Sequence, residues 1–386
     1  MKLATVSNSI ALLVFVCSKL STGAGEIRHL QVADNVLRLV AVERAALVHT
    51  AQVTGEPGTV EREMESALDQ LSQLLGEAGS SLSSVVKINA YVREDALSVS
   101  LESAIDRRFD SGDRPAVSFV TTPLPCTDCR VALDAVAAVE DPNAGATAPS
   151  DSSRKFAILP VGPRVYISGQ AEKGEGSLGP ATRATLESLG RTLDFLGLET
   201  SDVVQVKSFL TPMSEHSVAE REIATFFGGV AVPPSVFVEW QSSLPIEIEM
   251  IVAAPGLEMG PAVEVRTPPG MTTPAVYSRL TIARHPVTVY TDGLFPEDPA
   301  ASPESQLRSL FRRLKQGLDL AGSDWMHLVK ATYYVSDDEL SREHNLVRPD
   351  YFSPRRPPAA SKASVAGAGR PEHGITMDFI VVPGEP

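Results

Sequence analysis

Three acidic residues interrupt stretches that are otherwise apolar. Asp134, Glu249 and Asp378 each lie within a run of apolar residues that is typical of a buried strand. A carboxylate in such a run needs a partner or a cleft, because burying it without either is costly. In a cleft, a carboxylate can activate a water molecule as a general base. We therefore predict that these three acidic residues are catalytic, with structural pairing as the alternative.

The strands that must position these acids belong to a repeated pattern. The run Leu328–Val335, rich in β-branched and aromatic residues, has counterparts at Val85–Val92 and Val203–Leu210, at intervals of about 120 residues. Around each run the same signals recur: two strands, a helix with an apolar stripe, the run itself, a second helix and two closing strands. The sequence therefore predicts three α+β units of order ββαβαββ.

The repeats also set the predicted domain limits. We expect units at residues 27–140, 155–256 and 263–384, with a polar, proline-bearing linker at 141–154. A unit of this kind packs its helices on one face of its sheet and leaves the other face to be covered. Three joined sheets can cover one another, so we predict a monomer with internal pseudo-threefold symmetry.

Composition and charge narrow the classes of partner. The chain has 43% hydrophobic and 21% charged residues, which is typical of a globular protein. Its formal net charge of −14 repels phosphate backbones, so nucleic acid is not expected as a partner. Beyond the N-terminus no apolar run approaches transmembrane length, and no membrane partner is expected. The histidines show no paired metal-ligand spacing, and we predict neither a metal nor a cofactor.

Residues 1–24 differ from the rest of the chain. Lys2 gives a positive start, Ile10–Cys17 is an apolar run too short to span a bilayer, and Thr22-Gly23-Ala24 offers small residues for cleavage. This pattern predicts a signal peptide, and hence a protein exported to the periplasm or secreted. A buried N-terminal strand or helix is the alternative.

The exported chain would keep only two cysteines, Cys126 and Cys129. A redox Cys-x-x-Cys normally opens a helix, but Arg130–Val139 has the pattern of a strand. Two cysteines without nearby histidines are also too few for a structural zinc site. A local disulfide and a pair of loop thiols remain as the alternatives.

Several short motifs, taken in order, resemble the YjgF/RidA family, which is also labelled endoribonuclease L-PSP. The resembling motifs are the strand end Ser168-Gly169-Gln170, the strand start Val85-Val86-Lys87, the turn Pro115-Ala116, and the pairs Leu124-Pro125 and Leu244-Pro245 before last strands. The resemblance covers residues 27–384 in three copies. It implies a fold similar to bacterial chorismate mutase and a single-chain pseudo-trimer with ligand clefts between its units.

The resemblance also implies a reaction. Members of the family hydrolyse reactive enamines and imines to keto acids and ammonia, without a metal or cofactor. An arginine in a Pro-Ala-Arg pattern binds the substrate carboxylate by a bidentate pair, and a glutamate on the last strand, with backbone near a Ser-Gly pair, handles the water. By this resemblance Ser168, Gly169 and Gln170 bind a ligand in one cleft, and Asp292 and Gly293 in another.

This chain departs from the family at the arginine. Its position falls on Val117 in the first unit and Ser235 in the second, while in the third the alignment is ambiguous and Lys362 is the best cationic candidate. A lysine keeps the charge but loses the planar fork. The first unit also has Thr50-Ala51 in place of the Ser-Gly pair.

Three hypotheses for the function follow. The first is hydrolysis of a small carboxylate-bearing imine or enamine in clefts between units. The second is a non-catalytic small-molecule-binding module that has lost the family arginine. The third, a ribonuclease, is opposed by the acidic charge. A cation near Glu249 or Asp378 favours the first, whereas the neighbouring Glu247 is expected to face solvent.

Overall fold

The computed structural model describes residues 17–19, 25–32, 37–110, 112–140, 155–228 and 231–384. Apart from β1 (Cys17–Lys19), the predicted signal peptide lies outside these ranges, and so does the whole of the predicted linker. Within the described ranges, none of the helices has the length and apolar character needed to cross a membrane.

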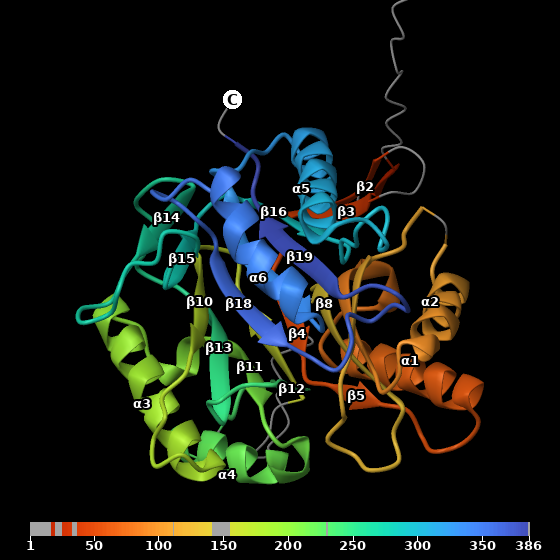
Figure 1. The fold of residues 1–386 in the computed structure, drawn as a ribbon, viewed down its shortest axis with the longest axis horizontal. Coiled ribbons are helices and arrows are strands. Elements are labelled where there is room, and N and C mark those ends of the chain that lie inside the picture. The colour runs from red at the N-terminus through yellow and green to blue at the C-terminus, as the bar shows by residue number, and fades with distance from the viewer. Residues whose placement is uncertain are drawn as a thin grey trace, which may run out of the picture.

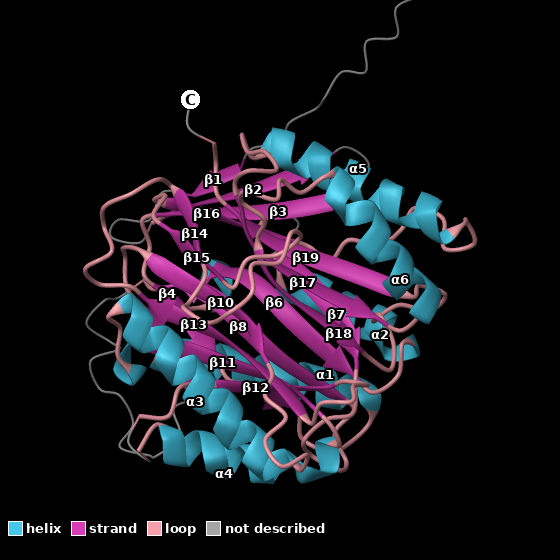
Figure 2. Cartoon of the chain, turned by 60° about the vertical axis from the view of Figure 1, so that its left-hand side comes forward, coloured by secondary structure: helices cyan, strands magenta, loops and turns pink. Residues whose placement is uncertain are grey.

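Three mixed sheets fill the interior and the helices lie on the outside (Figure 2). The first sheet has the order β7-β6-β8-β4-β9, and β5 also pairs with β8. Its strands are β4 (Leu47–Thr50), β5 (Val53–Thr54), β6 (Val85–Val92), β7 (Ala116–Thr121), β8 (Val131–Ala138) and β9 (Phe156–Leu159). Helices α1 (Val60–Glu77) and α2 (Ala96–Arg108) cover its outer face.

The second sheet has the order β12-β11-β13-β10-β15-β14. Its strands are β10 (Arg164–Gln170), β11 (Val203–Leu210), β12 (Ser235–Glu239), β13 (Ile246–Ala253), β14 (Val263–Arg266) and β15 (Leu280–Ala283). Helices α3 (Leu178–Leu196) and α4 (His216–Phe226) pack on it. Helix α3 ends at Gly197, whose φ of 70° is a left-handed conformation that glycine adopts without strain.

The third sheet has the order β1-β2-β3-β16-β19-β17-β18. Besides β1, its strands are β2 (Glu26–Val32), β3 (Leu37–Glu43), β16 (Val287–Thr291), β17 (Leu328–Val335), β18 (Ala359–Ser364) and β19 (Ile375–Val381). Helices α5 (Pro303–Leu320) and α6 (Asp338–Val347) cover it. The chain is thus an α+β protein of three chorismate-mutase-like units, which confirms the predicted fold class.

Each unit gives strands to a neighbouring sheet. Strand β3 pairs with β16, β9 pairs with β4, and β15 pairs with β10. None of the exchanged strands β3, β9 and β15 therefore lies beside the strand that follows it in sequence. Figure 1 shows the red N-terminal strands β2 and β3 among the blue elements of the C-terminal part. Each sheet therefore contains strands from two of the predicted units 27–140, 155–256 and 263–384, and the limits of these units remain predictions. The exchange of strands links the three units in a ring.

The inner faces of the three sheets meet in a shared core. One apolar layer takes Val86, Val204 and Val329 from equivalent strands, and a second takes Tyr91, Phe209 and Tyr334 further along the same strands. Between these layers lies a polar cluster that includes the three acids discussed below. Each sheet thus has one face against its helices and one against its neighbours, as the pattern of the units predicts.

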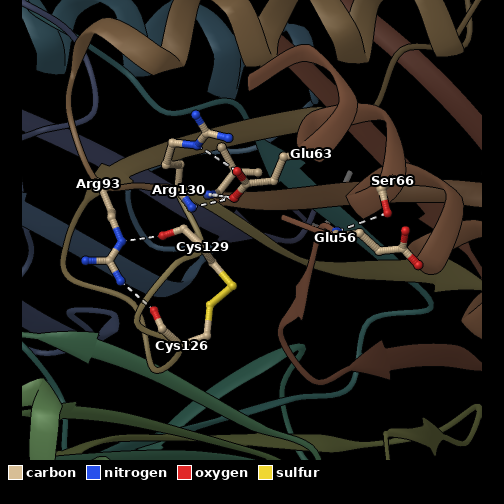
Figure 3. Close-up of a disulfide and its surroundings, with 8 residues drawn as sticks. Glu56, Glu63, Ser66, Arg93, Cys126, Cys129 and Arg130 are labelled. Atoms are coloured by element: carbon tan, nitrogen blue, oxygen red, sulfur yellow. Dashed lines mark hydrogen bonds and ion pairs between the residues drawn. A yellow bond between two sulfur atoms is a disulfide. The ribbon is translucent and has the colours of Figure 1, made fainter. Parts of the chain in front are cut away.

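Cys126 and Cys129 form a disulfide in the loop between β7 and β8 (Figure 3). Arg93 donates hydrogen bonds to the carbonyl oxygens of both cysteines, and the next residue, Arg130, pairs with the buried Glu63 of α1 at 2.7 Å. Of the two alternatives for these cysteines, the structure therefore has the local disulfide and not the pair of loop thiols. The disulfide loop packs against the second apolar layer of the shared core, in which Cys129 is buried.

Candidate functional site

Strand register identifies equivalent positions in the three units. Pairing on the last strands aligns Asp134 with Asn89, Glu249 with Lys207 and Asp378 with Thr332. By the same register, His49, Tyr166 and Tyr290 are equivalent, because each pairs with the residue two positions after an acid. The strand ends that follow are therefore Ala51-Gln52, Ser168-Gly169 and Asp292-Gly293. The expected pair Thr50-Ala51 was placed one residue early.

The three acids converge on the pseudo-threefold axis. They line a cavity of about 50 Å³ together with Lys87, Lys207 and Lys330. Glu249 Oε2 lies 2.9 Å from Lys330 Nζ, and Asp378 Oδ2 lies 3.7 Å from Lys87 Nζ. Each of these two acids thus has a cation nearby, as the hydrolysis hypothesis requires. In both cases, however, the cation is a lysine that forms a buried pair with the acid.

Asp134 and Lys207 complete the axial cluster without a direct ion pair. Asp134 accepts hydrogen bonds from Asn89 at 2.9 Å and from the Tyr91 hydroxyl at 2.5 Å. Lys207 donates to the Tyr334 hydroxyl at 2.5 Å, and its ammonium lies over three aromatic rings, including that of Phe209 at 5.7 Å. Burial raises the pKa of Asp134, and the charge of Lys207 opposes that shift. This geometry supports structural pairing; a catalytic role for the three acids stays a prediction.

The cleft between the first and second sheets is closed by Gln52. This residue takes the place of a glycine in the other two units, and its side chain enters the interface. Its amide nitrogen donates to the carbonyl oxygen of Phe237 at 3.0 Å, and its amide oxygen accepts from the Phe237 N–H, also at 3.0 Å. The side chain therefore adds a strand-like pair of hydrogen bonds at a position where the other units have a glycine.

The cleft between the second and third sheets is filled by Glu247. A Cβ placed on Gly169 would lie 1.9 Å from Glu247 Oε1, so the carboxyl group occupies the space in front of that glycine. Burial and the neighbouring charge of Glu249 raise the pKa of Glu247 to about 7. The expectation that Glu247 faces solvent was wrong, because its carboxyl group lies between Gly169 of its own sheet and Ser361 of the third sheet.

Several further hydrogen bonds surround this second interface. Ser168 Oγ accepts from the Ala360 N–H at 2.8 Å, and the Gly169 N–H donates to Ser361 Oγ at 3.1 Å. Ser361 Oγ in turn donates to Glu249 at 2.6 Å. Gln170 points the other way, donating to Thr192 Oγ1 of α3 at 2.9 Å. Ser168, Gly169 and Glu249 are thus brought together, whereas Gln170 supports the helix.

The third interface, between the third and first sheets, is open. A cavity of about 950 Å³ lies there beside Asp292 and Gly293. The Val117 N–H donates to Asp292 Oδ1 at 2.7 Å, and the Gly293 N–H donates to the Val117 carbonyl oxygen at 2.9 Å. We call this cavity the open cleft. It is the place where the strand end expected to bind a ligand faces a space large enough for a small molecule.

Lys362 does not reach any of these clefts. Register places Ala360 at the position of Val117, so Lys362 is equivalent to Phe119, which packs under the helices of its own sheet. Its ammonium donates to Ser341 Oγ at 3.1 Å and to Asn345 Oδ1 at 3.1 Å, both on α6. The proposal of Lys362 as a carboxylate clamp is therefore corrected: strand alternation turns the side chain toward the helix.

Arginines from other positions supply the cations of the open cleft. Its lining includes Arg38, Arg114, Arg313 and Arg370, together with Glu102, Asp106, Asp292 and Glu297. Most of these charges are paired with one another. Arg114 contacts Glu102 at 2.9 Å and also Asp106. Arg370 contacts both oxygens of Glu102, at 3.0 and 2.9 Å, and its guanidinium lies 4.8 Å from the ring centroid of Phe295.

Arg38 is the exception among these arginines. In the part of the chain that the structure describes, its guanidinium takes part in no hydrogen bond or ion pair, and only longer-range charges act on it. Partial burial lowers its pKa, while the nearby carboxylate of Asp292 opposes that shift. Arg38 comes from β3, one of the exchanged strands, and its carbonyl oxygen accepts from the Asp292 N–H at 2.9 Å. Among the described residues, Arg38 is therefore the arginine of the open cleft that has no direct partner.

Sequence reasoning missed Arg38, although a signal for it exists. Lys155 and Arg279 stand at the equivalent positions, since their carbonyl oxygens accept from Ala51 and Ser168 as that of Arg38 does from Asp292. A cation thus recurs at the start of each exchanged strand, either just before it or as its second residue. Arg279 is engaged by Thr272, at 2.6 Å to the hydroxyl. Within the described residues, no group of three or more His, Cys, Asp or Glu side chains is arranged to hold a metal ion.

Comparison with known proteins identifies the family. The family model for endoribonuclease L-PSP matches residues 41–139 and 271–382, which together are more than half of the chain. The chain therefore belongs to this family, as the sequence motifs predicted. No match was found among curated proteins.

Several solved structures resemble parts of the chain. Rv2704 of Mycobacterium tuberculosis, a member of the YjgF/YER057c/UK114 family, is 28% identical over 26% of this chain and 84% of its own, with a TM-score of 0.24. Yeast Mmf1 is 24% identical over 32% of this chain and 99% of its own, with a TM-score of 0.24. NMB1025 of Neisseria meningitidis, a YjgF protein, is 21% identical over 29% of this chain and 86% of its own, with a TM-score of 0.23.

Proposed function

We propose that this protein binds a small carboxylate-bearing ligand in the open cleft, with Arg38 as the group that binds the carboxylate. One observation carries the proposal. Of three equivalent strand ends, one is closed by Gln52 and one by Glu247, while the third faces a cavity of about 950 Å³ with an unengaged guanidinium. Four arginines and four carboxylates line the cleft, so its lining carries no net charge, and the guanidinium of Arg38 is the cationic group that remains available to a carboxylate.

Arg38→Gln is expected to weaken binding of a small monocarboxylate roughly 10- to 100-fold, because a hydrogen bond to a charged group contributes about 1.5–3 kcal/mol. Calorimetric titration of the purified full chain with pyruvate measures this loss. Arg279→Gln is the matched control, because Arg279 has the equivalent position but is bound to Thr272, and it should leave the affinity unchanged. Equal effects of the two substitutions, or none from Arg38→Gln, would reject the proposal.

A second candidate function is hydrolysis of small imino or enamine acids in the same cleft. Asp292 favours it, because burial raises the pKa of this carboxyl group toward the range useful in a general base. The group lies at the strand end, 4.0 Å from Arg114 Nη1, which limits the shift. Asp134, Glu249 and Asp378 line the axial cavity instead. In this scheme Asp292 is therefore the general base that activates water in the open cleft.

For this second candidate we expect Asp292→Asn to lower hydrolysis by a factor of about 10²–10⁴, the usual contribution of a general base. The rate of the wild-type protein should fall as the pH falls through the raised pKa of Asp292, because the protonated carboxyl cannot accept a proton. The assay generates the imine in situ with an amino-acid oxidase and follows ammonia. Binding of pyruvate without any acceleration of hydrolysis would leave a binding protein and exclude this candidate for that substrate class.

Export remains part of the proposal. The disulfide of Cys126 and Cys129 supports it, since such bonds persist mainly in oxidising compartments. Mass spectrometry of the protein from its native host should find a mature chain that begins at Gly25. A chain that starts at Met1 in the cytoplasmic fraction would exclude export.

A further inference from the structure

A charged side chain replaces a core aromatic residue in the third unit. Register places Lys362 at the position of Phe119 in the first sheet and of Phe237 in the second. Both phenylalanines pack in the apolar layer between their sheet and its helices. Lys362 lies half-buried in the corresponding layer beneath α6. A cation in such a layer needs a compensating negative charge, because its burial alone is unfavourable.

No carboxylate compensates Lys362 within the part of the chain that the structure describes. Its ammonium donates to the side chains of Ser341 and Asn345, each at 3.1 Å, and both acceptors are neutral. Burial and the positive charge of Arg348 lower the pKa of Lys362 to about 8, and among the described residues no carboxylate opposes this shift. The side chain is therefore a cation that lacks a counter-charge.

A second cation shares an acceptor with Lys362. Arg348 Nη2 donates to Asn345 Oδ1 at 3.1 Å, so one neutral oxygen serves the guanidinium and the ammonium together. Arg348 is 8% exposed, and its Nε has no hydrogen-bond partner among the described residues. Its guanidinium carbon lies 5.8 Å from the ring centroid of Tyr333. Two cations that converge on one amide oxygen are a donor set suited to an oxyanion.

The interior side of this cation pair adds no negative charge. His344 is fully buried between the rings of Phe311 and Tyr333, whose centroids lie 6.3 and 4.4 Å from its own. Burial and the charges of Arg348 and Lys362 hold the pKa of His344 well below its usual range, so the ring is neutral. On the other side the Asn345 side chain is exposed, so an anion from solvent can reach the shared acceptor.

We propose that a doubly charged oxyanion, such as a phosphate or sulfate group, binds between Lys362 and Arg348 beside Asn345. The ammonium and the guanidinium donate to its oxygens, and the Asn345 amide and the Ser341 hydroxyl can add further hydrogen bonds. The site lies between β18 and the C-terminal half of α6. None of these four residues lines the open cleft, so the inference does not rest on the proposed function.

Calorimetric titration of the full chain with inorganic phosphate and with sulfate tests the site. Chloride keeps the ionic strength constant, so that screening does not change during the titration. We expect saturable binding of at least one of the two anions. Lys362→Met should weaken it roughly 10- to 100-fold, because a hydrogen bond from a charged group is lost. Arg342→Met is the control, since Arg342 is an exposed cation of the same helix, and it should leave the affinity unchanged.

The titration of Lys362 gives a second readout that needs no variant. Carbon NMR of labelled lysine side chains follows its pKa, which an anion bound between the two cations raises from about 8. Sulfate, whose charge is constant over this range, should bind less tightly as the pH rises through the pKa of Lys362, because the neutral amine does not attract it. A pKa of Lys362 that saturating phosphate and sulfate leave unchanged overturns the site. Equal anion affinity of wild type and Lys362→Met, or no binding of either anion, also overturns it.

Discussion

Lys330→Met is expected to lower the free energy of unfolding by about 3–5 kcal/mol, the usual cost of removing one partner from a buried ion pair. Lys330 and Glu249 are 6% and 4% exposed, and their charged atoms lie 2.9 Å apart. Without the ammonium, the Ser361 hydroxyl is the one hydrogen-bond donor left to Glu249 among the described residues, and the carboxyl group stays in the axial core. Unpaired, its carboxylate would be strongly destabilising there.

Urea unfolding of purified variants measures this loss. Lys315→Met is the control, because its partner Asp319 is on the exposed face of α5 and such pairs contribute about 0–1 kcal/mol. The double variant Lys330→Met with Glu249→Leu should recover most of the stability, since it removes both charges from the core. If Lys330→Met proved no more harmful than Lys315→Met, the axial cluster would not be the dry, paired core described here.

The second large effect concerns the exchanged strands. An isolated fragment of residues 263–384, the predicted third unit, is expected not to fold. It lacks β3, which pairs with β16 and contributes Leu37, Leu39 and Ala41 to the core under α5. It also carries β14 and β15, which belong to the second sheet. The helices of the fragment would face a sheet without one of its central strands.

A rearranged fragment provides the control. Glu43 pairs with Val287 across the β3–β16 ladder, so residues 25–44 can be joined directly to residues 285–384 through a hairpin. This fusion restores the core of the third sheet, and we expect it to regain helix and strand signal in circular dichroism and a cooperative thermal transition. Cooperative folding of 263–384 by itself would contradict the strand exchange.

The sequence contained enough to predict the units but not their exchange. Periodicity located the helices and the repeated strand, since a helix such as α1 needs its apolar stripe wherever its sheet lies. The pairing of β3 with β16 instead of β4 leaves no trace in such patterns. The same alternation serves a hairpin within one unit and a ladder between two. Only the three-dimensional pairing distinguishes them.

Site residues were harder to predict because single positions decide them. The expected pair Thr50-Ala51 differs from the observed pair Ala51-Gln52 by a shift of one residue. The expected pair left the cleft apparently vacant, whereas the observed pair places Gln52 in it. Lys362 was chosen for its charge, but strand alternation places it against α6. The three acids were found because a carboxylate in an apolar run is unusual, although the lysine partners of Glu249 and Asp378 lie on neighbouring units.

The stoichiometry of ligand binding tests the central claim most directly. Ligand-observed and protein-observed NMR titrations of the full chain with pyruvate, carried to saturation, count the sites and locate them. We predict one site per chain, with shifts at Gly293, Asp292 and Arg38 and none at Gly169. Occupancy of two or three equivalent clefts, or shifts centred on Gly169, would contradict the account that Gln52 and Glu247 close two of three clefts.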